Sequence, residues 1–179
     1  KEWSEFNLSL LKKIDFKKCS RNQLKVLFFT THWTYKVNYL ESIKVIKKIS
    51  NNCNIFLVIK GHTRGSGSIS REDYISLVRS KNVIVNSSID SPSLINWADV
   101  VINVASSIAI EALIQQKPII YPFYLHRNKT IFDTPELVNL ASGYEEVISL
   151  LNNHYKGNKL FLPNKKYLRQ FFINEVYGG

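Results

Sequence analysis

The 179-residue sequence has no methionine, only two cysteines and no long hydrophobic run. Cys19 and Cys53 have neither CxxC spacing nor the neighbouring histidines of a zinc site, and two cysteines make no disulfide framework. A reducing compartment is therefore favoured over secretion. No apolar stretch approaches the roughly 20 residues needed to span a bilayer. The charged, helix-like residues 1–20 do not have the pattern of a signal peptide.

Acidic side chains are scarce as well, with 14 Asp and Glu against 24 Lys and Arg, which gives a net charge of +10. Such a chain favours anionic partners: nucleic acid, an anionic membrane surface or a phosphorylated small molecule. Aromatic and basic residues are not interleaved in an RNA-binding pattern, so nucleic acid is not expected as a partner. Charge alone does not choose between the other two.

Short apolar segments alternate with amphipathic ones along most of the chain. They predict strands at 24–31, 54–60, 82–88, 99–105, 118–122 and 137–141, separated by helices at 39–50, 71–80, 91–98, 107–116 and 144–152. The strands are continuously apolar, as parallel strands covered on both faces are. Single helices between strands imply right-handed crossovers. The predicted fold class is therefore α/β, a Rossmann-like doubly wound parallel sheet of about six strands with helices on both faces.

The helix predicted at 39–50 has one apolar face, made by Leu40, Ile43, Ile46 and Ile49. We expect this face to cover the sheet.

The tail KKYLRQFFINEVYGG predicts a last amphipathic helix, with Leu168, Phe171, Phe172 and Val176 on one side. This apolar side needs a surface to cover. It can pack on its own domain or dock across to a partner domain.

Two adjacent serines, Ser106 and Ser107, follow the predicted fourth strand in the stretch NVASSIAIEALIQQKPIIYP. In an open parallel sheet, ligands bind beyond the carboxyl ends of the strands, where loops lead into helix N-termini. A helix N-terminus offers unpaired N–H groups, and serine hydroxyls add donors, a combination that suits a phosphate. The alternative is that a serine only caps the helix.

A single carboxylate, Glu111, lies one turn into that helix. A capping box needs Glu or Gln three residues after the cap, but Ile110 has this position relative to Ser107. Glu111 lies four residues after Ser107 and shares its helix face, with Cβ atoms about 5–6 Å apart. A phosphate at the helix tip and a carboxylate one turn below suit a nucleotide, because the carboxylate can accept hydrogen bonds from both ribose hydroxyls. The alternative is a cap and a solvated glutamate.

The predicted second strand ends in LVIKGHTRG, which brings Lys60, His62 and Arg64 just beyond a buried segment. Three potential cations at the carboxyl end of a strand predict an anion site built from point charges on a loop. His62 is the group that titrates near neutral pH, so it is the candidate catalytic residue that stabilises or protonates a departing phosphate. The alternative is a solvated basic turn.

Three further candidates for the same site have weaker support. Thr31 and His32, with Thr30 before them, follow the first strand at this edge, and Tyr124 lies in the aromatic loop 121–133 after the fifth strand. His32 can equally be a structural histidine, and Tyr124 can equally belong to the core.

These segments resemble those of bacterial capsule and surface-polysaccharide glycosyltransferases. KGHTRG is similar to their K-P-H-P-R segment, and NVASSIAIEALIQQKPIIYP is similar to their serine-pair segment. From about Leu24 to Asn152 the chain resembles the C-terminal, donor-nucleotide-binding half of their two-domain GT-B fold. Sialyltransferases and Kdo transferases, which use CMP-sugars, carry similar motifs, and polymerases that use CDP-glycerol are related in layout. Gly61 and Thr63 replace the prolines on either side of the histidine, which puts the rigidity of this loop in question.

The resemblance implies a glycosyltransferase of capsule or lipopolysaccharide synthesis. His62 and Arg64 would contact the donor phosphate, Ser106 and Ser107 would hold it at the helix tip, and Glu111 would bind the ribose. The donor would be a nucleotide sugar, with a CMP-sugar slightly favoured over a CDP- or UDP-linked one, and no separate cofactor is expected. The sequence has no D-x-D motif, so no metal is expected, and protein cations and dipoles would neutralise the leaving group.

The resemblance also implies domain boundaries and partners. Residues 1–23 are expected to be a linker or helix from an N-terminal domain, 24–155 the nucleotide-sugar-binding domain, and 156–179 a C-terminal helix that can cross to its partner domain. That N-terminal domain, expected because the chain starts on Lys and lacks Met, would bind the saccharide or lipid-linked acceptor and supply the general base. The fragment alone is expected to be inactive and cytoplasmic, at the inner face of the membrane, whose anionic lipids attract a basic protein.

Two other functions remain open. A sugar-nucleotide epimerase of related fold would need catalytic carboxylates near the sugar, and only Asp133 and Glu136 are close in sequence to the predicted site. A non-catalytic basic adaptor that docks on an anionic membrane would bind with a steep salt dependence and would not need Ser107 or Glu111.

Overall fold

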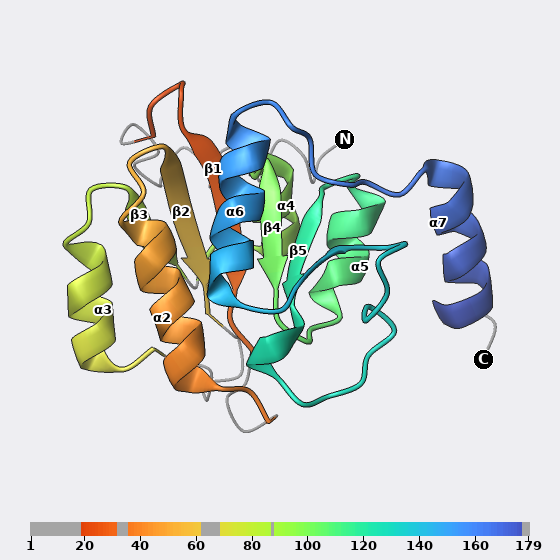
Figure 1. Ribbon diagram of the computed structural model, residues 1–179, viewed down its shortest axis with the longest axis horizontal. Coiled ribbons are helices and arrows are strands. Elements are labelled where there is room, and N and C mark those ends of the chain that lie inside the picture. Colours follow the sequence, from red (N-terminus) through yellow and green to blue (C-terminus); the bar gives the residue numbers. More distant parts are fainter. Residues whose placement is uncertain (1–18, 32–35, 62–68, 87, 177–179) are drawn as a thin grey trace.

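The computed structural model describes residues 19–31, 36–61, 69–86 and 88–176. Its centre is a six-stranded sheet in the order β3-β2-β1-β4-β5-β6 (Figure 1). The strands are β1 (Leu24–Phe29), β2 (Ile55–Lys60), β3 (Val83–Asn86), β4 (Val100–Asn103), β5 (Ile119–Pro122) and β6 (Asn139–Ala141). All five neighbouring pairs are parallel, which confirms the predicted doubly wound sheet.

Helices connect the strands and cover both faces. They are α2 (Tyr39–Ser50), α3 (Arg71–Val78), α4 (Ser91–Trp97), α5 (Ile108–Ile114), α6 (Tyr144–Tyr155) and α7 (Lys165–Phe171). A 3-10 turn, η2 (Phe123–Leu125), follows β5, and a π-helical turn, η3 (Phe172–Val176), continues α7. In Figure 1, α2, α3 and α6 lie in front of the sheet, and α4 and α5 lie behind it.

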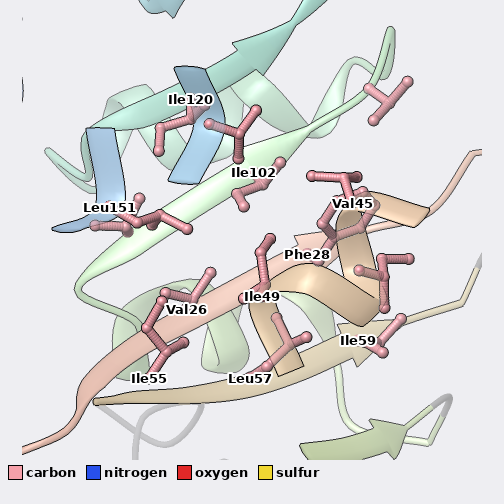
Figure 2. Packing of buried hydrophobic residues seen from close by; sticks show 14 of the residues in the cluster. Val26, Phe28, Val45, Ile49, Ile55, Leu57, Ile59, Ile102, Ile120 and Leu151 are labelled. Carbon is pink, nitrogen blue, oxygen red and sulfur yellow. The ribbon is translucent and has the colours of Figure 1, made fainter. Parts of the chain in front are cut away.

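Two hydrophobic clusters, one on each face, hold these layers together. Val26 and Phe28 of β1 belong to the cluster with α2, α3 and α6, whereas Leu27 and Phe29 belong to the cluster with α4, α5 and α7. Figure 2 shows side chains of the first cluster converging from the strands and from α2 and α6. Because successive strand residues point to opposite faces, strands covered on both faces are apolar over most of their length, and this is the pattern visible in the sequence.

The apolar face predicted for α2 is partly wrong. The helix itself has the predicted bounds, and Ile43, Ile46 and Ile49 are buried. Leu40, however, has 77% of its side chain exposed, and Val45 is buried instead. Asn38 caps the helix and accepts a hydrogen bond from the Glu41 amide at 3.2 Å, so Leu40 lies in the first turn, at the end of the helix.

The tail helix packs on the described domain itself. Leu168 of α7 is only 3% exposed and belongs to the cluster behind the sheet, and Phe171 and Phe172 pack against that cluster. These residues therefore contact the cluster behind the sheet, and docking of the tail to a partner domain stays a prediction. Within the described ranges, every helix is too short or too polar to span a lipid bilayer.

Parallel pairing aligns the carboxyl ends of the central strands. Phe29 at the end of β1 is in register with Lys60 of β2 on one side and with Asn103 of β4 on the other. The chain leaves β1 and β4 in opposite directions, since β2 lies beyond β1 and β5 lies beyond β4. This point, where the strand order reverses, is where open α/β sheets bind their ligands.

Candidate functional site

A cavity of about 450 Å³ opens at the carboxyl ends of β1, β2 and β4. Four predicted site residues meet there, because Lys60 comes from β2 and Ser106, Ser107 and Glu111 come from the β4–α5 segment. The cavity is lined by Phe29, Thr30, Lys60, Gly61, Ser91, Ser106, Ser107, Ile108, Ile110 and Glu111. A cavity therefore lies at the predicted edge of the sheet, and these four predicted residues line it together. The carboxyl ends of the strands are their arrowheads in Figure 1.

A sharp turn between β4 and α5 sets the position of the two serines. Ala105 has a φ of 47°, in the left-handed region that costs a residue with a side chain roughly 1–2 kcal/mol. Asn103 is fully buried, and its side-chain amide donates to the Ser106 carbonyl at 2.8 Å. The Asn103 hydrogen bond holds the strained turn closed, so the chain reverses at Ala105 and enters α5 with Ser106 and Ser107 at its tip.

Helix capping leaves hydrogen-bonding capacity on the hydroxyls of Ser106 and Ser107. Ser107 is the N-cap of α5, and its side chain makes no capping hydrogen bond. The Ser106 hydroxyl accepts from the Ile108 amide only at 3.5 Å, the outer limit of a hydrogen bond. The capping alternative accounts for these residues poorly, because a capping serine normally satisfies an amide of the first turn.

Glu111 lies one turn below the serines and faces the same cavity. Gln115 donates to one of its carboxylate oxygens at 2.7 Å and also to the Pro92 carbonyl at 3.1 Å. This bridge ties α5 to α4 and fixes the carboxylate. A carboxylate held in this way accepts hydrogen bonds from hydroxyl groups without having to be ordered first.

Lys60 contributes to the cavity wall, but its ammonium group is engaged elsewhere. The side chain is 3% exposed, and its Nζ donates to the Ile89 carbonyl at 2.6 Å. Burial lowers the pKa of Lys60, while the nearby Asp90 carboxylate opposes that shift. Lys60 thus joins the end of β2 to the segment that enters α4, a role that the sequence pattern did not suggest.

The remaining predicted residues divide into two groups. His62, Arg64 and His32 lie outside the described residues, although Gly61, which immediately precedes His62, lines the cavity. Thr31 is buried, at 3% exposure, and its neighbour Thr30 lines the cavity in its place.

Tyr124 does not line this cavity. Its ring is partly buried against the cluster in front of the sheet, and burial raises the pKa of its hydroxyl. It accordingly occupies a core position, one of the two possibilities that the sequence left open.

Within the described residues, no three His, Cys, Asp or Glu side chains gather as a metal site would require. Asp133 and Glu136, the carboxylates that an epimerase would need, are not among the lining residues. Both are exposed, and each accepts a hydrogen bond from a nearby threonine, Thr130 for Asp133 and Thr134 for Glu136.

Sequence reasoning missed Ser91, which lines the cavity, and Asn103 and Ala105, which shape the turn beside it. Ser91 begins α4 and lines the cavity from the β3 side. A signal existed for Asn103, since an amide at the end of an otherwise apolar strand must find a partner if it is buried. No signal marks Ala105, because alanine rarely adopts a left-handed conformation.

Comparison with known proteins finds no matching family model, and no curated protein matches the sequence. Solved structures do share the fold. ADP-heptose lipopolysaccharide heptosyltransferase II from E. coli matches with a TM-score of 0.58 and 9% identity, over 87% of this chain and 51% of that protein. A mutant of TarM from S. aureus, solved with UDP, matches with a TM-score of 0.55 and 14% identity, over 86% of this chain and 33% of TarM.

An enzyme of another class has the same fold. UDP-GlcNAc 2-epimerase from Neisseria meningitidis, bound to UDP-GlcNAc, matches with a TM-score of 0.53 and 16% identity, over 97% of this chain and 52% of that protein. The chain thus spans between 33% and 52% of the length of these three proteins. The resemblance to GT-B glycosyltransferases is confirmed at the level of the fold.

Proposed function

We propose that this chain is the donor-binding domain of a metal-independent glycosyltransferase of bacterial capsule or lipopolysaccharide synthesis. The observation that carries the proposal is the cavity at the strand-order reversal, where two serine hydroxyls, one of them without a capping hydrogen bond and the other with only a long one, lie one helical turn above a fixed carboxylate. Its volume of about 450 Å³ suits a small-molecule ligand. The shared fold of a heptosyltransferase and of TarM, solved with UDP, supports this choice.

Each group has a role in this proposal. The hydroxyls of Ser106 and Ser107 donate to a phosphate of the donor, and Glu111 accepts hydrogen bonds from the ribose. His62 and Arg64, on the segment that follows Gly61, supply positive charge to the same phosphate. When the bond between the sugar and the phosphate oxygen breaks, its electron pair leaves with the nucleotide, and these donors stabilise the charge that develops.

The acceptor and the general base belong to the N-terminal domain in this proposal. The acceptor hydroxyl forms the new bond to the sugar, and its proton goes to that base. The described chain alone then binds nucleotide without transferring sugar. A CMP-sugar is the favoured donor, because the combination of a histidine loop and a serine pair resembles that of CMP-sugar enzymes.

Isothermal titration with CMP, CDP and UDP tests the proposal directly. We expect at least one of them to bind, with CMP the tightest, and with an affinity unchanged by EDTA. The double variant Ser106→Ala/Ser107→Ala should weaken binding about tenfold or more, because two charge-assisted hydrogen bonds are lost. Ser76→Ala, at an exposed serine of α3, is the matched control and should bind as the parent does. If folded protein binds none of the three nucleotides, the proposal is wrong.

The leading alternative is a basic adaptor that docks on anionic membranes, favoured by the net charge of +10. It predicts steeply salt-dependent binding to vesicles of phosphatidylglycerol that Ser107→Ala and Glu111→Gln leave unchanged. Nucleotide binding that depends on these two residues argues against it. An epimerase, in contrast, would convert a nucleotide sugar with no acceptor present.

A further inference from the structure

A second cavity, of about 650 Å³, lies at the opposite edge of the sheet. Leu24, Asp99 and Pro118 line it where β1, β4 and β5 begin, and α6 contributes its last turn with His154 and Tyr155. The six residues of β1 separate this edge from the first cavity by about 20 Å. The two cavities share no lining residue.

The polar wall of this second cavity is fixed by hydrogen bonds. Lys117 donates to the carbonyls of Asn96 and Ala98, both at 2.8 Å, and so closes the end of α4. The Asp99 carboxylate accepts from the Lys25 amide at 2.9 Å. Groups held in this way do not have to be ordered when a ligand binds.

His154 has a defined tautomer in this wall. Its Nδ1 accepts a hydrogen bond from the Leu160 amide at 3.0 Å, which leaves Nε2–H as the donor of the neutral ring. Burial, with a contribution from the Lys159 charge, lowers the pKa of His154 and so favours the neutral ring.

Two cations on this cavity are uncommitted. Arg21 and Lys159 are exposed lining residues, and the ion pairs of the described chain involve neither of them. Beside them, Tyr155 and Leu162 expose 40% and 37% of their surface. The cavity thus combines positive charge with an aromatic ring, and among the described residues that line it Asp99 is the only carboxylate and is already hydrogen-bonded.

We infer that this amino-edge cavity is a second binding site, for a saccharide that carries a phosphate or a carboxylate. Arg21 and Lys159 pair with the anionic group, the His154 Nε2–H donates to it or to a hydroxyl, and Tyr155 covers the apolar face of the sugar ring. The choice of a saccharide rests on the proposed function, because a polysaccharide-building enzyme can hold its acidic polymer at a distance from the donor. The positive charge and the fixed wall do not depend on that function.

Saturation-transfer NMR titration of the full 179-residue chain with glucose 1-phosphate, glucuronate and glucose tests this inference. Both acidic sugars, or one of them, should bind saturably, and uncharged glucose should bind at least about tenfold more weakly. The double variant Arg21→Gln/Lys159→Gln should weaken acidic-sugar binding about tenfold while leaving the melting temperature unchanged, since both side chains are exposed. A preference between the two acids identifies which anionic group the site takes.

The matched control removes two exposed cations outside the cavity, Arg79→Gln/Lys156→Gln, and should bind as the parent does. Equal loss in this control would show attraction to overall charge and overturn the inference, as would unchanged binding by Arg21→Gln/Lys159→Gln. Ser107→Tyr, which fills the first cavity, should abolish nucleotide binding and spare acidic-sugar binding. Loss of acidic-sugar binding in Ser107→Tyr would assign the sugar to the first cavity and overturn the inference, whereas loss of nucleotide binding alone concerns only the proposed function.

Discussion

Lys60 shows how burial changes the role of a residue that looks like a ligand-binding cation. The sequence places it among His62 and Arg64, and the structure directs its ammonium to the buried Ile89 carbonyl. A buried carbonyl that loses its donor costs about 1–3 kcal/mol. Lys60 therefore stabilises the wall of the first cavity through its hydrogen bond to the segment that enters α4.

Replacing Lys60 with methionine tests this role. We expect Lys60→Met to lower the free energy of unfolding by about 1–3 kcal/mol, because the apolar chain fits and the Ile89 carbonyl is left without this donor. Urea unfolding followed by circular dichroism measures the change, and Lys81→Met, at an exposed lysine, should stay within about 0.5 kcal/mol of the parent. Equal stability of the two variants would contradict the assignment.

His126 is a second buried polar residue whose role depends on its protonation. It is 8% exposed, its Nδ1 accepts from the Asn128 amide at 3.2 Å, and its Nε2 has no hydrogen-bond partner among the described residues. Burial lowers the pKa of His126. Below the unfolded-state pKa of about 6.5, the unfolded chain therefore binds more protons than the folded one.

The stability contributed by neutral His126 should be fully present above about pH 6.5 and decline as the pH falls toward its lower folded-state pKa. His126→Asn keeps an acceptor for the Asn128 amide and cannot titrate. We expect its free energy of unfolding to fall less steeply between pH 6.5 and 5 than that of the parent. The free energy of unfolding of the variant should still fall somewhat with pH, because the pKa of His154 is lowered too. Parallel profiles of parent and variant would rule out a part for His126.

At the scale of elements, both turns that flank α5 use left-handed residues that are not glycine. Ala105 precedes the helix, and Gln116, with a φ of 56°, follows it. The Lys117 amide bonds the Ala112 carbonyl at 2.9 Å and the Gln116 amide bonds the Leu113 carbonyl at 3.0 Å, the pattern of a Schellman cap. Glycine is the residue that this cap normally has at the position of Gln116.

Gln116→Gly should therefore stabilise the protein by about 0.5–1 kcal/mol, since relief of left-handed strain exceeds the added entropy of the unfolded chain. Thermal and urea unfolding measure the gain. Gln116→Ala keeps the strained conformation and serves as the control, with a stability equal to or below that of the parent. A glycine variant no more stable than the alanine variant would show that the turn stores no strain.

The elements themselves were largely predictable, because their signals are local and repeated. Apolar runs predicted the six strands, and the structure adds the N-caps of α2 and α4, Asn38 and Asp90, each of which accepts a hydrogen bond from an amide three residues on. Leu40 was misplaced because periodicity does not reveal where the sheet ends beneath a helix. The β4–α5 turn was unpredictable, since its shape depends on the Asn103 hydrogen bond and on strain at Ala105.

At the scale of the whole molecule, sheet topology explains why distant segments meet. Parallel register fixes the ends of β1, β2 and β4 at one edge, so residues 60 and 106 line one cavity although they are far apart in sequence. The sequence could predict this convergence but not which side chains are free to bind. Tyr124 looks like a site residue in the sequence but packs against the core, and Lys60 lines the cavity while its ammonium donates to the Ile89 carbonyl.

The most direct test of the donor site maps the tightest-binding nucleotide onto the chain. In an amide chemical-shift titration of the folded protein, we predict the largest perturbations at Gly61 and over residues 105–111, with little change around His154 and Lys159. Nucleotide binding that perturbs the amino edge instead, or leaves residues 105–111 unmoved, would contradict the account.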